Sequence, residues 1–290
     1  MAERKPKPAS KQPETPDKPG RDYVLNLNNI QEMFTAKPSR ANEYADSLIV
    51  FYEDETSALR WFGVPTKASL DTAIFQGWPE GVKRAQKITD GLELSVPVIK
   101  SLRRKTRYGA EGDEICVERY LQKDFDHCFA ERVKIDGRST KGKIVTITVN
   151  LAYGCKRTTD EAFYRGAVTS LLTDTLENAG YRVEIVGKIS IEHPFVDIRN
   201  ANGKIFITIP IKSSNEPMDI NRLIALTGLA GAFRYYGFKL ITTAPEAVIN
   251  SLGAAISSAP YAIDGDNIVI GDIWDKQTAI DALNGILGEF

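Results

Sequence analysis

The sequence predicts an α/β fold: a doubly wound mixed sheet with helices on both faces, preceded by an N-terminal mixed helical and irregular region. The first observation is a strand–loop–helix–strand order between Lys143 and Ser190. The second is the alternation of strand-like and helix-like segments from there to the C-terminus. Strands that alternate with helices at this spacing are typical of a sheet with helical layers.

The segment 143–150 begins this unit, because β-branched residues alternate there with polar ones and favour a strand. Thr158 then supplies a hydroxyl where the N-terminus of a helix needs an acceptor. The expected helix extends to Asn178, and Gly180 closes it in the manner of a C-cap glycine. A second strand is expected over 181–187.

Downstream of this unit the pattern predicts further strands and helices, including two strands on either side of a hairpin turn at 200–203. The expected elements are strands at 195–199 and 204–211, a helix from 220 to 236 capped by Asp219 and ended by Gly237, a strand at 238–242, a helix from 245 to about 256, a strand at 267–270, and a helix capped by Asp275 that runs to about 287. Together with the first unit they predict an α/β domain over 143–290.

The first half of the chain is less regular. Residues 1–21 are rich in Lys and Pro and poor in apolar side chains, so we expect a disordered tail. Residues 22–142 are expected to form a mixed α+β region. Its expected elements are a strand at 47–52, a helix capped by Ser69 and ended by Gly77, and a helix through Ile88, whereas 94–142 carries dense mixed charge and little periodicity.

The composition limits the classes of protein. The 290 residues carry a net charge of −1, so the whole chain is not directed by charge to nucleic acid or to an anionic membrane. No apolar run approaches the roughly 18–20 residues of a membrane span, and no secretory signal is recognisable at the N-terminus. The three cysteines form no CxxC pair, and their odd number argues against a disulfide framework. We therefore expect a cytoplasmic protein.

The loops at the carboxyl ends of the strands are the candidate binding site, because open α/β sheets bind ligands there. The loops after the strands at 143–150, 204–211 and 238–242 contribute to it. The candidate partner-binding residues are Asn150, Tyr153, Lys156, Arg157, Ser213 and Asp219. We expect these loops to bind another protein.

A basic segment supports an alternative function, the binding of nucleic acid. Basic side chains beside an aromatic ring can contact phosphates while the ring stacks on a base. The candidates are Arg103, Arg104, Lys105, Arg107 and Tyr108. Lys156 and Arg157, near the positive end of the following helix, would extend this surface. Neighbouring acids and a pI of about 6.2 weaken the field, so a mixed-charge surface is the competing interpretation.

The sequence contains no pattern that supports an enzyme. It has no phosphate-binding glycine loop, no dinucleotide-binding glycine pattern and no serine elbow. His127 lies in a turn where the residues of ligand type are adjacent in sequence, and adjacent residues seldom converge on one metal ion. We interpret the acids Asp113, Glu114 and Glu118 as a solvated face rather than a nuclease metal site. No enzymatic activity, no cofactor and no metal are therefore predicted.

The order of elements over 143–290 resembles a von Willebrand factor A-type domain, in which a strand, a long helix and a strand precede an antiparallel partner and alternating helices and strands. That family binds a divalent cation through an Asp-x-Ser-x-Ser sequence after its first strand, and such oxygens suit a hard cation. The matching positions here are Asn150, Ala152 and Gly154. The resemblance therefore implies a degenerate site without tightly bound metal.

A second resemblance covers the body of the chain from Trp61 onward. Trp61-Phe-Gly, the segments 77–81 and 112–120, the strand to Asn150 and the helix end at 178–184 are similar to a family of tailed-phage and prophage proteins. That family has no assigned activity, and it implies a phage-encoded protein in the host cytoplasm without catalytic residues. The expected function is a non-enzymatic protein-interaction module for a phage or host protein. The alternative is a nucleic-acid-binding accessory protein in phage replication or transcription.

Overall fold

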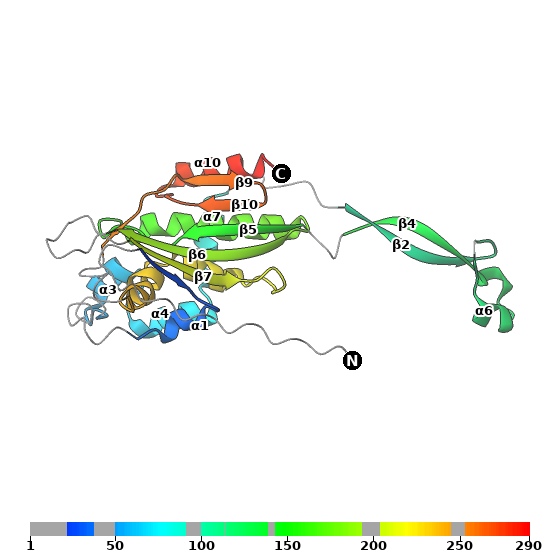
Figure 1. The fold of residues 1–290 in the computed structure, drawn as a ribbon, viewed down its shortest axis with the longest axis horizontal. Coiled ribbons are helices and arrows are strands. Elements are labelled where there is room, and N and C mark those ends of the chain that lie inside the picture. Colours follow the sequence, from blue (N-terminus) through cyan, green and yellow to red (C-terminus); the bar gives the residue numbers. More distant parts are fainter. Residues whose placement is uncertain are drawn as a thin grey trace.

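The computed structural model describes residues 22–37, 50–90, 100–112, 114–138, 143–192, 204–244 and 253–290. Within these residues, a seven-stranded mixed sheet and its helices form a body, and a three-stranded arm extends from it (Figure 1). The strands of the body are β1 (Tyr23–Asn26), β5 (Ile144–Asn150), β6 (Arg182–Glu192), β7 (Lys204–Lys212), β8 (Ala254–Ala255), β9 (Tyr261–Asp264) and β10 (Asn267–Ile270). The mixed α/β class that the sequence predicted is confirmed.

The sheet has the order β1-β7-β6-β5-β10-β9, and β8 pairs with β6. β5 runs parallel to β6 on one side and to β10 on the other. β7 runs antiparallel to β6, while β1 is parallel to β7 and β9 is antiparallel to β10. Because β7 reverses direction, its carboxyl end lies at the opposite end of the sheet from the carboxyl ends of β5 and β6.

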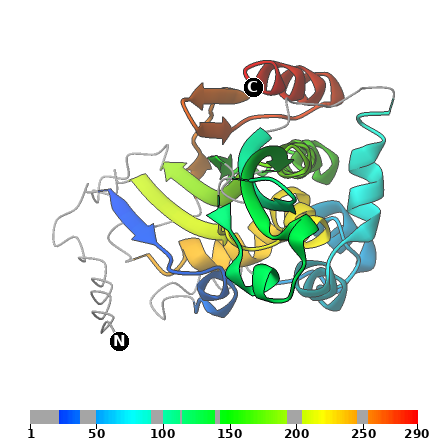
Figure 2. The same ribbon diagram turned by 90° about the vertical axis from the view of Figure 1, so that its right-hand side faces the viewer.

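One face of the sheet is buried and the other is more open. The buried face includes three fully buried residues of β5, Val145, Ile147 and Val149. The opposite face, formed by the alternate positions of the strands, includes the exposed residues Lys188 of β6 and Val269 of β10. α7 (Thr159–Asn178) contacts β5, β6 and β10, and the other helices described in the body pack on α7 or on its neighbours. Figure 2 shows the helices of residues 55–86 on the right of the sheet and β1, in blue, on its left.

The predicted second layer of helices is therefore not found in the described part of the chain. The strands explain this difference. Thr146 and Thr148 alternate with the buried residues of β5 and stay partly accessible. Such alternation is typical of a sheet with one solvated face, whereas strands covered on both faces are apolar almost throughout.

α7 begins and ends as predicted. The Thr158 hydroxyl accepts the N–H of Glu161 at 3.1 Å, and the Glu161 carboxylate accepts the N–H of Thr158 at 2.7 Å, which makes a capping box. At the other end Gly180 has φ 100°, in the left-handed region that favours glycine. Local residues thus fix both ends of the helix that leads away from β5.

Replacing Glu161 with glutamine should make the free energy of unfolding depend less on pH in the acid range. The N–H of Thr158 holds the pKa of the Glu161 carboxyl below its ordinary value of 4.5. The ionised carboxylate therefore stabilises the fold above that value, and this contribution is lost as the pH falls through the lowered folded pKa. Urea unfolding from neutral to acid pH should show the wild type losing its advantage over Glu161→Gln. A difference between the two proteins that stays constant with pH would contradict this prediction.

α7 crosses α8 (Ile220–Gly228) at two glycines. A Cβ added at Gly166 would lie 2.7 Å from the carbonyl carbon of Thr227 and closer still to the backbone of Gly228. The structure shows that at Gly166 the close approach joins two helices.

The N-terminal region shares its core with the C-terminal half. β1 pairs with β7, and α1 (Gln31–Thr35), α3 (Glu55–Phe62), α4 (Lys67–Gln76) and α5 (Pro79–Gln86) lie on the same helical layer as α7 and α8. Their buried side chains, among them Phe62 and Leu70, belong to one hydrophobic cluster with those of 143–290. The boundary expected at residue 142 therefore does not separate two cores. The tail predicted at 1–21 lies outside the described residues.

α3 was not expected from the sequence, and its cap shows why it forms. The Asp54 carboxylate accepts the N–H of Ser57 at 2.8 Å at the start of the helix. α4 begins after Thr66, whose hydroxyl accepts the N–H of Ser69 at 3.0 Å. Thr66 rather than Ser69 is thus the N-cap, while Gly77 ends this helix as predicted.

The arm comprises the described residues of 100–138, a segment in which the sequence showed little order. β2 (Lys100–Gly109) pairs antiparallel with β4 (Phe129–Arg138), and β3 (Glu114–Ile115) adds to the other side of β4. α6 (Val117–Leu121) and the short 3₁₀ helix η1 (Phe125–His127) lie near the far end. The charged residues of β2 hide its strand character, because they do not alternate with apolar ones.

The segment after β7 differs most from expectation. α8 is capped by Asp219 as predicted, but it stops at Gly228 because Leu229 is extended, with φ −84° and ψ 122°. A π-helix, η2 (Ala232–Gly237), and α9 (Phe238–Ile241) follow. The strand expected at 238–242 is therefore wrong, since a short apolar run fits a buried helix equally well.

The remaining predictions divide between confirmed elements and positions outside the description. α10 (Lys276–Leu287) is capped by Asp275 as predicted, and β10 matches the expected strand. The expected strand at 195–199, the turn at 200–203, and residues 245–252 of the expected helix at 245–256 lie outside the described residues. Residues 254–255 form β8, and residues 50–52 of the strand expected at 47–52 are not in a strand.

Candidate functional site

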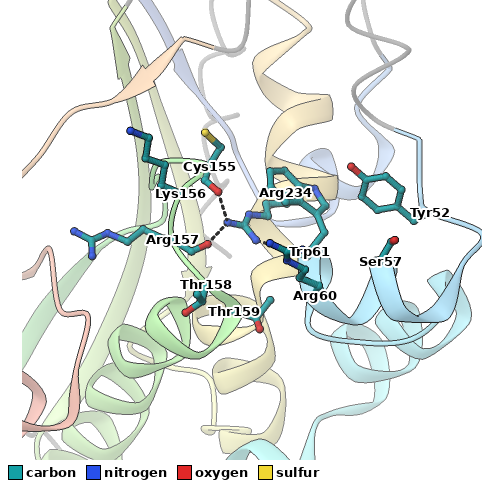
Figure 3. A pocket seen from close by; sticks show the side chains of 10 residues that line it. All are labelled: Tyr52, Ser57, Arg60, Trp61, Cys155, Lys156, Arg157, Thr158, Thr159 and Arg234. Carbon is teal, nitrogen blue, oxygen red and sulfur yellow. Dashed lines mark hydrogen bonds between the residues drawn. The ribbon is translucent and has the colours of Figure 1, made fainter.

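A pocket with a volume of about 440 Å³ lies at the carboxyl end of β5, between the loop after β5 and α3 (Figure 3). Its described basic residues are Arg60, Lys156, Arg157 and Arg234. Its other described residues are Tyr52, Ser57, Trp61, Cys155, Thr158 and Thr159. We call this cavity the basic pocket, because no carboxylate is among the described residues that line it.

Arg234 of the π-helix holds the two sides of the basic pocket together. It is only 2 % exposed, and its guanidinium lies 4.0 Å from the centre of the Trp61 ring. It donates to the carbonyl of Trp61 at 2.7 Å and to the carbonyls of Cys155 and Arg157 (Figure 3). Burial lowers the pKa of Arg234. These bonds tie the end of α3 to the loop after β5, so the pocket has a fixed, positively charged wall.

A second buried guanidinium lies behind that wall. Arg165 of α7 is 1 % exposed and donates to the carbonyls of Asn150 and Ala152, where the chain leaves β5. Burial lowers the pKa of Arg165 to about 10. Tyr153 contacts both Arg165 and Arg234 through its ring, and burial raises the pKa of its hydroxyl to about 12. The loop after β5 is thus held rigidly from inside.

The four basic residues of the pocket differ in how their charges are used. Arg157 forms an ion pair with Glu161 at 2.8 Å, and its guanidinium lies 4.5 Å from the Trp274 ring. Within the described chain, Arg60 and Lys156 are exposed and form no ion pair. Figure 3 shows the Lys156 side chain extending outward at the rim. Arg60 and Lys156 are therefore the cations that an incoming anion can pair with.

Carboxylates adjoin the lining residues in sequence, and helix caps or ion pairs use several of them. Asp54 accepts from Ser57 at the start of α3, and Glu161 accepts from Thr158 at the start of α7. Asp160 forms an ion pair with Arg84 at 2.9 Å. Their charges reduce the positive end of each helix, so the pocket depends on Arg60, Lys156 and Arg234 for its positive potential.

The structure places the predicted residues of the β5 loop in two different environments. Lys156 and Arg157 line the basic pocket. Asn150 and Tyr153 are buried instead. The Asn150 amide donates to the Ser258 hydroxyl at 3.3 Å, and the Tyr153 hydroxyl donates to the Ala230 carbonyl at 3.1 Å. These two side chains shape the loop from within and do not present a surface to a partner.

Ser213 and Asp219 lie at the other end of the sheet, which corrects the expected cluster. The reason is the antiparallel direction of β7, whose last residue Lys212 pairs with Ile185 near the start of β6. Asp219 caps α8 and lines a second cavity of about 460 Å³. The N–H of Ser213 donates to the Glu216 carboxylate at 2.8 Å. This second cavity is lined by both acids and bases, so it has no clear preference for one charge.

The nucleic-acid candidates all belong to the arm. Arg103, Arg104, Lys105 and Arg107 are in β2, and the strand alternation puts positions 103, 105 and 107 on one face and position 104 on the other. Tyr108 is 39 % exposed, and the Arg119 guanidinium lies 4.3 Å from its ring centre. The ring that was expected to stack on a base is therefore already stacked by an arginine.

Sequence reasoning missed the half of the basic pocket that comes from α3 and the π-helix. Trp61 was not among the predicted site residues, and Arg234 was predicted to lie within the expected helix from 220 to 236. A sequence signal exists for each residue. Asp54 lies three residues before Ser57, a spacing that suits a helix cap. Arg234 is the one charged residue in the apolar run 229–238, and a charge in such a run needs polar partners.

Other kinds of site are not evident in the described chain. No group of three or more His, Cys, Asp or Glu side chains among the described residues is arranged to hold a metal ion. His127 bonds Asp124 through Nδ1 at 3.0 Å near the end of the arm, where Glu114 and Glu118 are exposed. No helix in the described segments is long and apolar enough to cross a membrane. The basic pocket is the candidate recognition site in which all charged residues of the described lining have the same sign.

Comparison with known proteins places the chain in a family. No curated protein matches the sequence, and no solved structure matches it. A family model described as Domain of unknown function (DUF7192) matches residues 7–290, which is nearly the whole chain. The chain therefore belongs to this family of proteins with a domain of unknown function.

Proposed function

We propose that this protein is a non-enzymatic protein-interaction module that receives an acidic group of its protein partner in the basic pocket. The observation that carries the proposal is the pair of exposed cations, Arg60 and Lys156, beside the buried charge of Arg234. A cleft lined by one sign of charge concentrates ligands of the opposite sign. A carboxylate side chain or a similar anion would pair with Arg60 or Lys156 without displacing an ion pair formed within the described residues.

The position of the pocket supports a binding role. Ligands of open α/β sheets bind beyond the carboxyl ends of the strands, and the pocket lies at this end of β5. The order β7-β6-β5-β10, with β7 antiparallel, is compatible with the proposed resemblance to a von Willebrand factor A-type domain. Under this resemblance Asn150 stands at the position of the metal-binding carboxylate. Its side-chain amide donates to the Ser258 hydroxyl and accepts the N–H of Ala152. The proposal therefore includes a degenerate metal site.

The chemistry of the lining supports binding rather than catalysis. Ser57, Cys155, Thr158 and Thr159 are groups that can act as nucleophiles. A nucleophile of this kind needs a base within hydrogen-bond reach. Neither His nor a carboxylate is among the described lining residues. The proposal extends to a phage-encoded protein acting in the host cytoplasm, on the sequence resemblance described above.

The alternative proposal is a nucleic-acid-binding accessory protein. It is supported by the arm, because β2 carries four basic residues on a hairpin that extends away from the body in Figure 1. Phosphates would contact those residues and would also suit Arg60 and Lys156. A strong dependence of affinity on salt concentration is expected for such contacts.

Cys155 gives a direct measurement of occupancy, because its exposed thiol lines the basic pocket while Cys116 lies on the arm. Site-resolved mass spectrometry can follow the alkylation of each cysteine by N-ethylmaleimide at low protein concentration. We expect a glutamate-rich peptide to slow alkylation of Cys155 and to leave Cys116 unaffected. The substitutions Arg60→Glu and Lys156→Glu should weaken this protection on the order of tenfold or more in peptide concentration.

The matched control is Lys276→Glu, which makes the same charge change at an exposed position on α10 outside the pocket. This variant should be protected like the wild type. Equal alkylation of Cys155 with and without the peptide would contradict the proposal. Protection by a single-stranded oligonucleotide but not by the peptide, abolished by raised salt, would favour the nucleic-acid alternative.

A further inference from the structure

The far end of the arm exposes an unusual concentration of apolar side chains. We call the described residues of 108–130 the arm tip. Of the thirteen large hydrophobic residues that are exposed in the described chain, six lie here: Tyr108, Ile115, Val117, Tyr120, Leu121 and Phe125. An exposed apolar patch of this kind usually marks an interaction surface.

The arm tip is ordered by its own contacts. The N–H of Cys116 donates to the Cys128 carbonyl at 2.7 Å, which closes the two sides of the tip. Arg119 lies over the Tyr108 ring and forms an ion pair with Asp124 at 3.3 Å. The apolar side chains are therefore presented on a preorganised surface, and preorganisation lowers the entropy cost of binding.

The charge of the arm tip is mainly negative. Its exposed carboxylates are Glu111, Glu114, Glu118 and Asp126. Lys123 is exposed, whereas Arg119 is already paired within the tip. The patch is thus both apolar and acidic, and it suits a partner surface that is apolar and basic.

The basic pocket and its border have that complementary character. Arg60 and Lys156 supply positive charge that no carboxylate of the described residues pairs with. The apolar side chains beside them are also exposed: Tyr52 lines the pocket, and Leu59, next to Arg60 on α3, is 53 % exposed. The same chain therefore carries two surfaces that match each other in charge and in apolar content.

These two surfaces lie at opposite ends of β5. The arm joins the body just before Ile144, where β5 begins, and the basic pocket lies beyond Asn150, where β5 ends. A seven-residue strand spans about 23 Å. In Figure 1 the arm extends away from the body on the side opposite α3. The arm tip thus points away from the pocket of its own chain, and a second copy can supply the pocket.

We propose that the arm tip of one copy docks into the basic pocket of a second copy. The proposal rests on the proposed function, because it names the partner whose acidic group enters the pocket. Since the two surfaces are different, the contact is heterologous, and each copy can give a tip and receive one. Such contacts build a ring when the rotation closes and an open chain when it does not.

Substitutions that reverse one charge on each surface test the proposal. Sedimentation velocity on the full chain, over a wide range of concentration, should show assembly that grows with concentration. Glu118→Lys on the tip or Arg60→Glu at the pocket should each weaken association on the order of tenfold. The double variant should recover a large part of the loss, because the reversed tip then meets the reversed pocket. Glu289→Lys, a matched change outside both surfaces, should assemble like the wild type.

The native cysteines identify the surfaces in contact. A short bismaleimide should join Cys116 of one copy to Cys155 of another, and Cys116→Ser or Cys155→Ser should remove that product. A chain that stays monomeric at every concentration, or crosslinks that join only Cys155 to Cys155, would overturn the docking proposal. Such a result, with Cys155 still protected by the glutamate-rich peptide, would leave the proposed function standing. Loss of the peptide protection as well would remove both.

Discussion

Replacing Gly166 with alanine is expected to destabilise the protein by about 3 kcal/mol or more. The new Cβ would lie 2.7 Å from the carbonyl carbon of Thr227 and closer still to the backbone of Gly228. Both obstacles belong to the backbone of α8, so a side-chain rotation cannot remove them. The helices must separate, and the buried side chains along their crossing then lose contact.

The sign of this effect is informative. In an unconstrained helix, Gly→Ala stabilises by about 1 kcal/mol, because alanine loses less backbone entropy on folding. A loss at Gly166 therefore means that packing outweighs helix propensity at the crossing. For a chain of this size, 3 kcal/mol corresponds to a fall of roughly 6–12 °C in Tm.

Urea unfolding and thermal melting of Gly166→Ala provide the measurement. Gly154→Ala is the matched control, because a Cβ added at Gly154 meets nothing within 4 Å. The control should stay within about 0.5 kcal/mol of the wild type. If the two variants proved equally stable, α7 and α8 would not approach each other at Gly166 as closely as the structure shows.

The elements that sequence reasoning found are those that local residues determine. α7 has a capping box at Thr158 and a left-handed glycine at Gly180, and both act within a few residues of the chain. β5 shows its buried face in its own alternation of Val145, Ile147 and Val149 with polar residues. Asp275 likewise places the start of α10. For such elements the sequence needs no knowledge of the rest of the fold.

The elements that it missed depend on contacts between distant segments. The apolar run 238–242 fits a strand or a buried helix, and only its surroundings decide. Gly237 was expected to end a helix, yet its φ of −63° is helical and the chain continues as α9. The alternation in β5 was visible, but its consequence, one open face, emerged only with the helices in place.

The candidate site likewise contains residues that the sequence indicated and residues that it did not. The loop after β5 was predicted to take part in binding, and this stays a prediction; its residues Lys156 and Arg157 line the basic pocket. Arg60 and Arg234 come from segments far from that loop in sequence. Ser213 was grouped with the β5 loop because both follow strands, but the antiparallel direction of β7 separates them. The direction of β7 relative to β5 depends on how the strands pair within the sheet, and the alternation of residues within each strand does not show that pairing.

Arg234→Met is expected to destabilise the protein by about 2–4 kcal/mol and to open the basic pocket. Methionine fills much of the space but donates no hydrogen bond, so the carbonyls of Trp61, Cys155 and Arg157 lose their donor. An unsatisfied buried polar group costs about 1–3 kcal/mol. Removing the buried charge offsets part of this loss, because burial lowers the pKa of Arg234 and thus opposes its charged form. The three lost bonds outweigh that relief.

Arg84→Met is a suitable control for this substitution. Both guanidinium groups lie 4.0 Å from an aromatic ring centre, Arg84 over Phe163 and Arg234 over Trp61. Arg84 is partly exposed, however, and its ion pair with Asp160 is a surface one worth at most about 1 kcal/mol. A large loss only for Arg234→Met, with faster alkylation of Cys155, would show that the three carbonyl bonds hold the loop to α3. Equal small losses for both would mean that ring stacking is the main role of Arg234, and the pocket wall would then have to be held by Arg165 and Tyr153 from behind.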